Sequence, residues 1–240
     1  MRVLHFFKTY LPDSMGGTQQ VIFQQCQSGM AYGVHSEVLT LSANPEPREV
    51  MVADHLVHRV KLDLQVSSTD FSFSVFKRFR ELAVQADIIN YHFPWPFMDL
   101  VHFASAIKKP VVVSYHSDIV RQKYLMRLYS PLMHAFLQRA DRIVAASPNY
   151  LETSPVLKRY QDKTVVIPYG LDRSGYPVPG EACVARWEQR FGRRFFLFVG
   201  VLRYYKGLHI LLEAAQGTNY PVVIVGSGPL EQELRARAAA

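Results

Sequence analysis

The sequence has little cysteine and none in a pattern that binds metal. Cys26 and Cys183 are its only cysteines, they lie far apart, and neither belongs to a CxxC pair. This usage argues against a disulfide scaffold and against a zinc site. We therefore expect a protein of the reducing cytoplasm.

Long apolar runs and blocks of basic residues are also missing. No stretch approaches the length of a membrane span, and the first residues, MRVLHFFKTY, lead into an expected strand without a signal peptide. Any membrane contact would be peripheral. The formal charge of +7 suits a phosphorylated ligand, an acidic membrane or nucleic acid. Because no Lys/Arg run or RNA-binding signature occurs, nucleic acid is not an expected partner.

Two nucleotide-binding fingerprints are absent as well. The chain contains neither GxGxxG nor GxxxxGK[ST], so a dinucleotide-dependent oxidoreductase and a P-loop enzyme lose their main support.

Apolar periodicity is the strongest positive signal. Short apolar runs alternate with segments of helical spacing, which predicts an α/β fold with a parallel, helix-covered sheet. The expected strands are 3–7, 37–41, 56–62, 87–91, 111–115, 143–146 and 165–167, and the expected helices are 17–32, 74–86, 97–107 and 119–139. In the last helix, Leu125, Leu128, Leu132, Phe136 and Leu137 are spaced for a buried stripe, and Pro131 predicts a kink or a break.

Proline and glycine mark a change of domain. The stretch PYGLDRSGYPVPG has little periodicity, so we expect an N-terminal domain over 1–170, a linker over 171–190 and a second unit over 191–240. The second unit shows two strands, 195–199 and 222–225, each followed by a helix. Two strands are too few for an ordinary doubly wound domain, which indicates one complete Rossmann-like domain and the first part of another.

Arg203 and Lys206 are the leading candidate ligand-binding residues. They follow the expected strand 195–199 and precede a helix that begins near Gly207. The carboxyl ends of parallel strands are where ligands bind in open α/β sheets, and helix N-termini favour anions, so a phosphate is the expected ligand. Two solvated surface cations are the alternative.

Other candidates follow other expected strands. Gly16 and Gly17 come after the first strand and open the first helix, where glycine lets a ligand approach the backbone, although a tight turn explains such a pair equally well. His116 ends VVVSYH, with Asp118 placed to orient the loop; a structural histidine is the alternative.

Three further motifs complete an ordered set along the chain. They are IPYGLD with Gly170, FVGVLRYYKG with Arg203 and Lys206, and VGSGP with Gly226 and Gly228.

Together these motifs resemble the retaining, nucleotide-sugar-dependent glycosyltransferases of GT-B architecture, in which two Rossmann-like domains face each other across a cleft. The stretches INYHFPWPFMDL, SYHSDIVRQKYLMRLY and KRYQDKTVVIPYGLD are similar to a narrower branch, the bacterial mannosyl- and rhamnosyltransferases of O-antigen synthesis.

The resemblance implies roles for the candidate residues. Arg203 and Lys206 would hold the donor diphosphate, so neither a metal nor another cofactor is expected, and His116 would touch the transferred sugar. Backbone amides at Gly16 and Gly17 would contact phosphate or acceptor, and Gly170, Gly226 and Gly228 would belong to the donor site. Attack on the sugar from the same face as the departing phosphate would retain the configuration at the reacting carbon, so no carboxylate nucleophile is expected.

The resemblance also implies the substrates. A GDP-sugar, carrying mannose or D-rhamnose, would donate to a lipid-linked saccharide in lipopolysaccharide synthesis at the inner face of the cytoplasmic membrane. The segments RQKYLMR (121–127) and YHFPWPF (91–97) could contact lipid or acceptor. An ordinary charged helix face and core aromatics are the alternative.

One departure from the family pattern concerns the end of the chain. Members carry two glutamates eight positions apart late in the second domain, whereas Glu231 and Glu233 come too early and too close together. We therefore expect a C-terminally truncated chain. A catalytically inactive remnant that keeps only the fold and partner or lipid binding is the alternative function.

Overall fold

The chain divides into two compact units. We describe it from a computed structural model in which residues 1–66, 69–119, 123–192 and 194–239 are described. Unit 1 spans Met1–Asp172 and unit 2 spans Arg173–Ala240.

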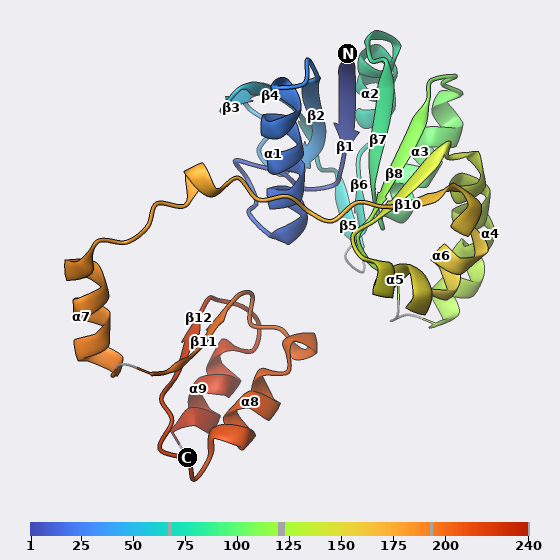
Figure 1. Cartoon of the computed structure of the whole chain (residues 1–240). Coiled ribbons are helices and arrows are strands. Elements are labelled where there is room, and N and C mark those ends of the chain that lie inside the picture. The colour runs from blue at the N-terminus through green and yellow to red at the C-terminus, as the bar shows by residue number, and fades with distance from the viewer. Residues whose placement is uncertain (67–68, 120–122, 193, 240) are drawn as a thin grey trace. The chain divides into compact units, whose positions relative to one another are not determined.

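Unit 1 is built on a large, mostly parallel sheet (Figure 1). The strand order is β10-β9-β8-β7-β1-β2-β4-β3, and only the edge strand β3 runs antiparallel to its neighbour. The strands are β1 (Arg2–Phe6), β2 (His35–Ser42), β3 (Glu49–Val52), β4 (His55–Lys61), β7 (Ile88–Phe93), β8 (Val111–Tyr115), β9 (Arg142–Ala145) and β10 (Thr164–Val166). The predicted α/β class and parallel sheet are confirmed. The sequence did not predict β3 or the separate hairpin of β5 (Leu64–Val66) and β6 (Thr69–Phe71).

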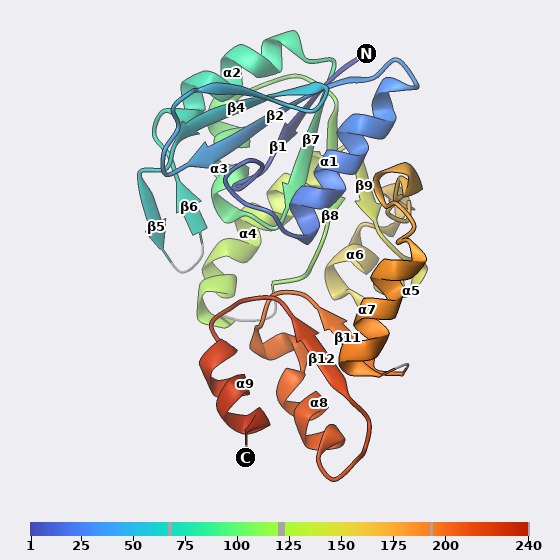
Figure 2. The same cartoon turned by 90° about the vertical axis from the view of Figure 1, so that its left-hand side faces the viewer.

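Helices cover both faces of this sheet. Helix α1 (Gly17–Met30) lies on one face, and α2 (Val75–Gln85), α3 (Pro96–Ser105) and α4 (Lys123–Arg139) lie on the other (Figures 1 and 2). Short helices α5 (Pro148–Thr153) and α6 (Pro155–Arg159) connect β9 to β10. Ser147 caps α5, its hydroxyl accepting the Tyr150 N–H at 3.1 Å.

Alternate residues of each strand point to opposite faces, and the two faces differ. The face toward α2, α3 and α4 carries large apolar side chains that form the main core. From β1, β7 and β8 these are Leu4, Phe6, Ile89, Tyr91, Phe93, Val111, Val113 and Tyr115. Beneath α1 the apolar cluster is smaller and includes Phe7, Tyr10, Ile22, Cys26, Val38 and Val57.

The buried stripe of α4 differs from the predicted one. Leu125 is 53% exposed and Leu128 is 82% exposed, whereas Met133, Phe136 and Leu137 are buried. Met126 and Tyr129 pack against the core instead of the two leucines. Apolar residues occupy neighbouring helical positions here, so spacing alone did not fix which side faces the sheet. The helix continues through Pro131; its predicted first residues, 120–122, lie outside the described part of the chain.

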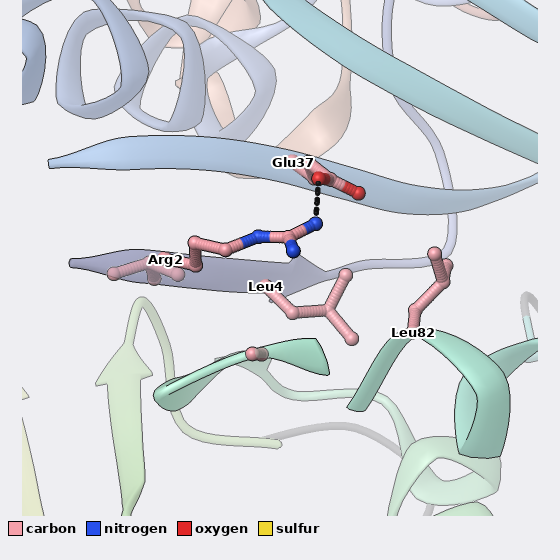
Figure 3. Close-up of a pocket in the computed structure, with 6 residues that line it drawn as sticks. Arg2, Leu4, Glu37 and Leu82 are labelled. Atoms are coloured by element: carbon pink, nitrogen blue, oxygen red, sulfur yellow. Dashed lines mark hydrogen bonds and ion pairs between the residues drawn. The ribbon is translucent and has the colours of Figure 1, made fainter. Parts of the chain in front are cut away.

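An ion pair joins β1 and β2 near their amino ends, and the pocket beside it is small. The guanidinium of Arg2 reaches the Glu37 carboxylate at 2.9 Å, with Leu4 and Leu82 beside it (Figure 3). The pocket between them has a volume of only about 10 Å³, room for about one water molecule. The other carboxylate oxygen of Glu37 accepts a hydrogen bond from His58 Nε2, on the neighbouring strand β4, at 2.7 Å.

Unit 2 pairs two parallel strands with helices. It contains α7 (Glu181–Phe191), β11 (Phe196–Val199), α8 (Leu208–Ala215), β12 (Val222–Val225) and α9 (Glu231–Ala238). Leu202, Leu208 and Leu234 form its core. Helix α7 lies almost entirely in the segment 171–190 that was expected to be a linker, and it was not predicted. Its sequence, EACVARWEQRF, contains no helix breaker.

Candidate functional site

A row of polar side chains crosses the α1 face of the unit 1 sheet. In the parallel register His5 pairs with Asn90, and His92 pairs with Ser114. Residues paired in this way point to the same face, as does His116 two positions after Ser114. The row therefore runs from the middle of β1 to the carboxyl end of β8.

Three imidazoles in this row are joined by hydrogen bonds. His5 Nδ1 lies 3.0 Å from His92 Nε2, and His92 Nδ1 lies 2.9 Å from His116 Nε2. Their rings stack in pairs, with centroids 5.3 and 5.2 Å apart. At the carboxyl end, His116 Nδ1 lies 2.6 Å from the hydroxyl of Tyr169.

Burial keeps these imidazoles neutral. It lowers the pKa of His5 to about 3, helped by the charge of His55, and lowers the pKa of His116 to about 4. The pKa of His92 falls well below its usual value because of burial and then of the neighbouring His116 and His5. At neutral pH each ring therefore offers one N–H donor and one acceptor nitrogen.

His116 lies where the sequence placed it, at the carboxyl end of β8. Its neighbour Tyr169 belongs to the IPYG motif and precedes Gly170, so the structure brings these two predicted features together. Asp118 accepts hydrogen bonds from Tyr115 at 2.7 Å and from Ser154 at 2.8 Å, which fixes the loop after His116.

Gly16 and Gly17 lie at the start of α1, at the same edge of the sheet. Gly16 is the N-cap residue, and no side chain caps the helix. A Cβ on Gly16 would come within 2.8 Å of Gln19 Oε1, whereas one on Gly17 would meet nothing within 4 Å. The amides at this helix start thus have open space beside Gly17, and their contact with a ligand stays a prediction.

A cavity of about 240 Å³ separates α1 from the sheet. Gln24, Gln25 and Ser28 of α1 line one side, and the row residues Asn90 and Ser114 line another. Residues 167–170 close it, and the Asp172 N–H donates to Gln24 Oε1 at 3.2 Å. The cavity is slightly smaller than an ordinary small-molecule pocket.

In unit 2 the predicted cations share one turn. Arg203 precedes the 3₁₀ turn Tyr204–Lys206, and Gly207, at φ 68°, begins α8. Both cations are exposed, and the described part of the chain gives neither an ion pair. Lys206 Nζ lies 5.5 Å from the centroid of the Tyr205 ring. The turn therefore offers two positive charges beside a helix start, an arrangement that suits a phosphate.

Gly226 and Gly228 have a packing reason to be glycine. A Cβ on Gly226, at φ 145°, would lie 1.9 Å from the Gly200 carbonyl oxygen, and one on Gly228 would lie 2.6 Å from that of Leu202. The loop after β12 therefore runs directly against the loop that carries Arg203. The role of Gly226 and Gly228 in donor binding stays a prediction.

The aromatic segment 91–97 is not a lipid-contacting surface. Tyr91, Phe93 and Trp95 are at most 1% exposed, and Trp95 Nε1 donates to the Asp70 carbonyl oxygen at 3.0 Å. Here the alternative, core aromatics, is correct. Alternation along β7 turns Tyr91 and Phe93 toward the main core, and Trp95 packs into the same core after the strand ends.

Sequence reasoning missed His5, Asn90, His92, Ser114 and Tyr169. For three of these residues and for His116, alternation in the sequence carried part of the information. The pattern NxH in IINYHF and the pattern SxH in VVVSYH each place two polar residues on one face of a strand.

The candidate residues fall into two groups. Unit 1 holds Gly16, Gly17, His116 and Gly170, and unit 2 holds Arg203, Lys206, Gly226 and Gly228. The described residues contain no cluster of three His, Cys, Asp or Glu side chains that could hold a metal ion. No helix in the described ranges has the length and apolar character to cross a bilayer.

Comparison with known proteins identifies the family. The profile of Glycosyltransferase Family 4 matches residues 15–174, and that of Glycosyl transferases group 1 matches residues 185–240. Because the first profile covers more than half of the chain, the chain belongs to Glycosyltransferase Family 4.

Two curated relatives are similar to this chain along almost its whole length. The D-rhamnosyltransferase WbpZ of Pseudomonas aeruginosa is 63% identical over all 240 residues, and the O-antigen chain mannosyltransferase C of Escherichia coli is 51% identical over 238 residues, 99% of this chain. The chain spans 63% and 64% of their respective lengths.

Solved structures agree on the fold. HepE of Anabaena in complex with UDP-glucose has a TM-score of 0.72 and 16% identity, with all of this chain covering 65% of that one. The expected fold class, one Rossmann-like unit followed by the first part of a second in a GT-B glycosyltransferase, is confirmed.

The buried histidines predict how stability depends on pH. Unfolded histidine takes up a proton near pH 6.5, whereas His5 in the folded chain does so only near pH 3. The stability that neutral His5 contributes is thus complete above about pH 6.5 and is lost as the pH falls, at about 1.4 kcal/mol per pH unit. Urea unfolding followed by circular dichroism between pH 7.5 and 5 measures it.

Two variants separate this effect from other titrations. His5→Gln is expected to lower the slope of stability against pH by about 1.4 kcal/mol per pH unit, because His92 and His116 continue to contribute. His35→Gln, at an exposed position, is expected to leave the slope unchanged. Equal slopes for His5→Gln and the wild type would contradict the assignment.

The packing of Gly226 predicts a local loss of stability. Gly226→Ala must push the two loops of unit 2 apart, and we expect a destabilisation of about 2 kcal/mol or more. Amide hydrogen exchange should accelerate in β11 and β12. Gly175→Ala, where a Cβ meets nothing within 4 Å, is the matched control; equal exchange in both variants would refute the close approach.

Proposed function

We propose that this protein is a hexosyltransferase that moves mannose or D-rhamnose from a GDP-sugar, with retention, to a lipid-linked saccharide in O-antigen synthesis. The observation that carries the proposal is the 63% identity to a D-rhamnosyltransferase along the whole chain. The mannosyltransferase relative, at 51% identity, supports the same reaction class and leaves both hexoses open.

The turn with Arg203 and Lys206 would bind the donor diphosphate. Negative charge grows on the diphosphate as the bond to the sugar breaks, so cations fixed before the reaction stabilise the transition state more than the ground state. The exposure of both side chains, without acidic partners in the described part of the chain, supports this role. Two cations can supply the positive charge that a metal would otherwise bring.

The carboxyl edge of unit 1 would receive the sugars. His116 is neutral at working pH because burial lowers its pKa to about 4. A neutral imidazole can form a hydrogen bond with a sugar hydroxyl without adding a charge that competes with the donor phosphate. Retention and a GDP donor are carried over from the family resemblance.

An exposed patch on α4 supports peripheral contact with the inner face of the cytoplasmic membrane. Leu125, Arg127 and Leu128 are all exposed near the start of this helix. Aliphatic side chains beside a cation suit an anionic lipid surface. Residues 121–122 of the predicted basic segment lie outside the described part of the chain.

Calorimetric titration of the 240-residue chain with GDP, UDP and ADP tests the donor site. We expect saturable binding of GDP alone, weakened about 10- to 100-fold by Arg203→Ala, because hydrogen bonds to charged groups contribute about 1.5–3 kcal/mol. Arg235→Ala, which removes an exposed α9 cation paired with Glu231, should bind GDP like the wild type. Equal GDP affinity of the Arg203→Ala chain, or no binding, would reject the donor site; GDP binding without hexose transfer would favour the inactive remnant.

Vesicle binding tests the α4 patch. Leu128→Glu should lower partitioning onto anionic phosphatidylglycerol vesicles about tenfold, because it removes an aliphatic contact of about 1.5 kcal/mol or more and adds a repelled charge. The control is Val84→Glu on α2, which alters an aliphatic side chain that is 69% exposed. A uniform loss in both variants would indicate only the general effect of charge.

A further inference from the structure

We propose that Asn90, through His5 and His92, fixes the tautomer of His116 so that its Nδ1 accepts a hydrogen bond from a sugar hydroxyl. A relay of hydrogen bonds thus links Ser114, Asn90, His5, His92 and His116. Its first four residues are positioning residues for His116. The inference deepens the proposed function, on which the identity of the ligand as a sugar rests.

The relay begins at an amide whose orientation is set. The Ser114 hydroxyl donates to Asn90 Oδ1 at 3.0 Å, which leaves the Asn90 Nδ2 group to face His5 Nδ1 at 3.4 Å. An amide NH₂ has only hydrogens to offer, so His5 Nδ1 must be the acceptor nitrogen of its ring. The proton of neutral His5 is then on Nε2, which lies 3.3 Å from Ser36 Oγ.

Each later ring is determined by the one before it. Because His5 Nδ1 accepts, His92 Nε2 carries a proton and donates across the 3.0 Å contact. His92 Nδ1 is then the acceptor, and His116 Nε2 must donate to it across 2.9 Å. The acceptor of His116 is consequently Nδ1, at the carboxyl edge of the sheet.

The Tyr169 hydroxyl occupies this acceptor in the structure. It lies 2.6 Å from His116 Nδ1 and, since that nitrogen has no proton, it donates. Tyr169 is 46% exposed and His116 is half-buried, whereas His5 and His92 behind them are buried. A hydroxyl of a bound saccharide offers the same donor chemistry as the phenol, and it can replace the phenol without any change of protonation along the relay.

Nitrogen-15 NMR of the histidine side chains in the 240-residue chain at pH 7.5 tests the relay. We expect protonated Nε2 and unprotonated Nδ1 in His5, His92 and His116. In Asn90→Leu the amide that selects the tautomer is gone, so the Nδ1 signal of His116 should move toward a mixture of both tautomers. Asn149→Leu, at an exposed position on α5, should leave the signal unchanged.

A second variant guards against a folding defect. Ser114→Ala keeps the volume of the site almost unchanged but releases the orientation of Asn90, and it should shift the His116 signal in the same direction. A protonated Nδ1 in wild-type His116, or wild-type tautomers in both variants, would overturn the proposal. The spectra require no turnover, so the relay and the transferase activity can fail independently.

Discussion

The site in unit 1 depends on one constraint: a polar group buried in a sheet must find a hydrogen-bond partner. The strands β1, β7 and β8 place bulky apolar residues toward α2, α3 and α4, which leaves the opposite face free for imidazoles, an amide and a hydroxyl. These groups satisfy one another along a row that ends at the carboxyl edge. The contacts with His92 and Tyr169 therefore hold the His116 ring in one orientation, and the proposed sugar contact would use this preorganised ring.

Unit 2 positions its candidate cations by close backbone contact between two loops. The loop with Gly226 and Gly228 lies directly on the backbone around Gly200 and Leu202, immediately before the turn with Arg203. The glycines thus shape the loop that presents the cations, and the cations themselves stay exposed. This arrangement fits a turn that binds a phosphate from solution, because fixing the backbone limits the entropy that the loop loses when a ligand binds.

Much of this could be predicted from the sequence. The ends of apolar runs located His116 and Arg203, because an apolar run that stops abruptly marks the end of a strand. The run before Arg203 does form the strand β11, although Phe196, Leu197 and Val199 are each more than half exposed. The phase of α4 could not be predicted in this way, because Leu125 and Met126 are both apolar and only contact with the sheet decides between them. The edge strand β3 was missed because it has only four residues, EVMV, so its alternation of exposed and half-buried positions is too short to be distinctive. The histidine relay requires the order and register of β1, β7 and β8, which no local pattern contains.

Amide NMR of the nitrogen-15-labelled chain during a titration with GDP-mannose tests the central claim, that the donor binds at these strand ends, most directly. Binding as described predicts saturating shifts in the turn from Arg203 to Gly207 and in the facing loop around Gly226. Shifts confined to residues far from the carboxyl ends of the strands, such as the pocket beside Arg2 and Glu37, would contradict it.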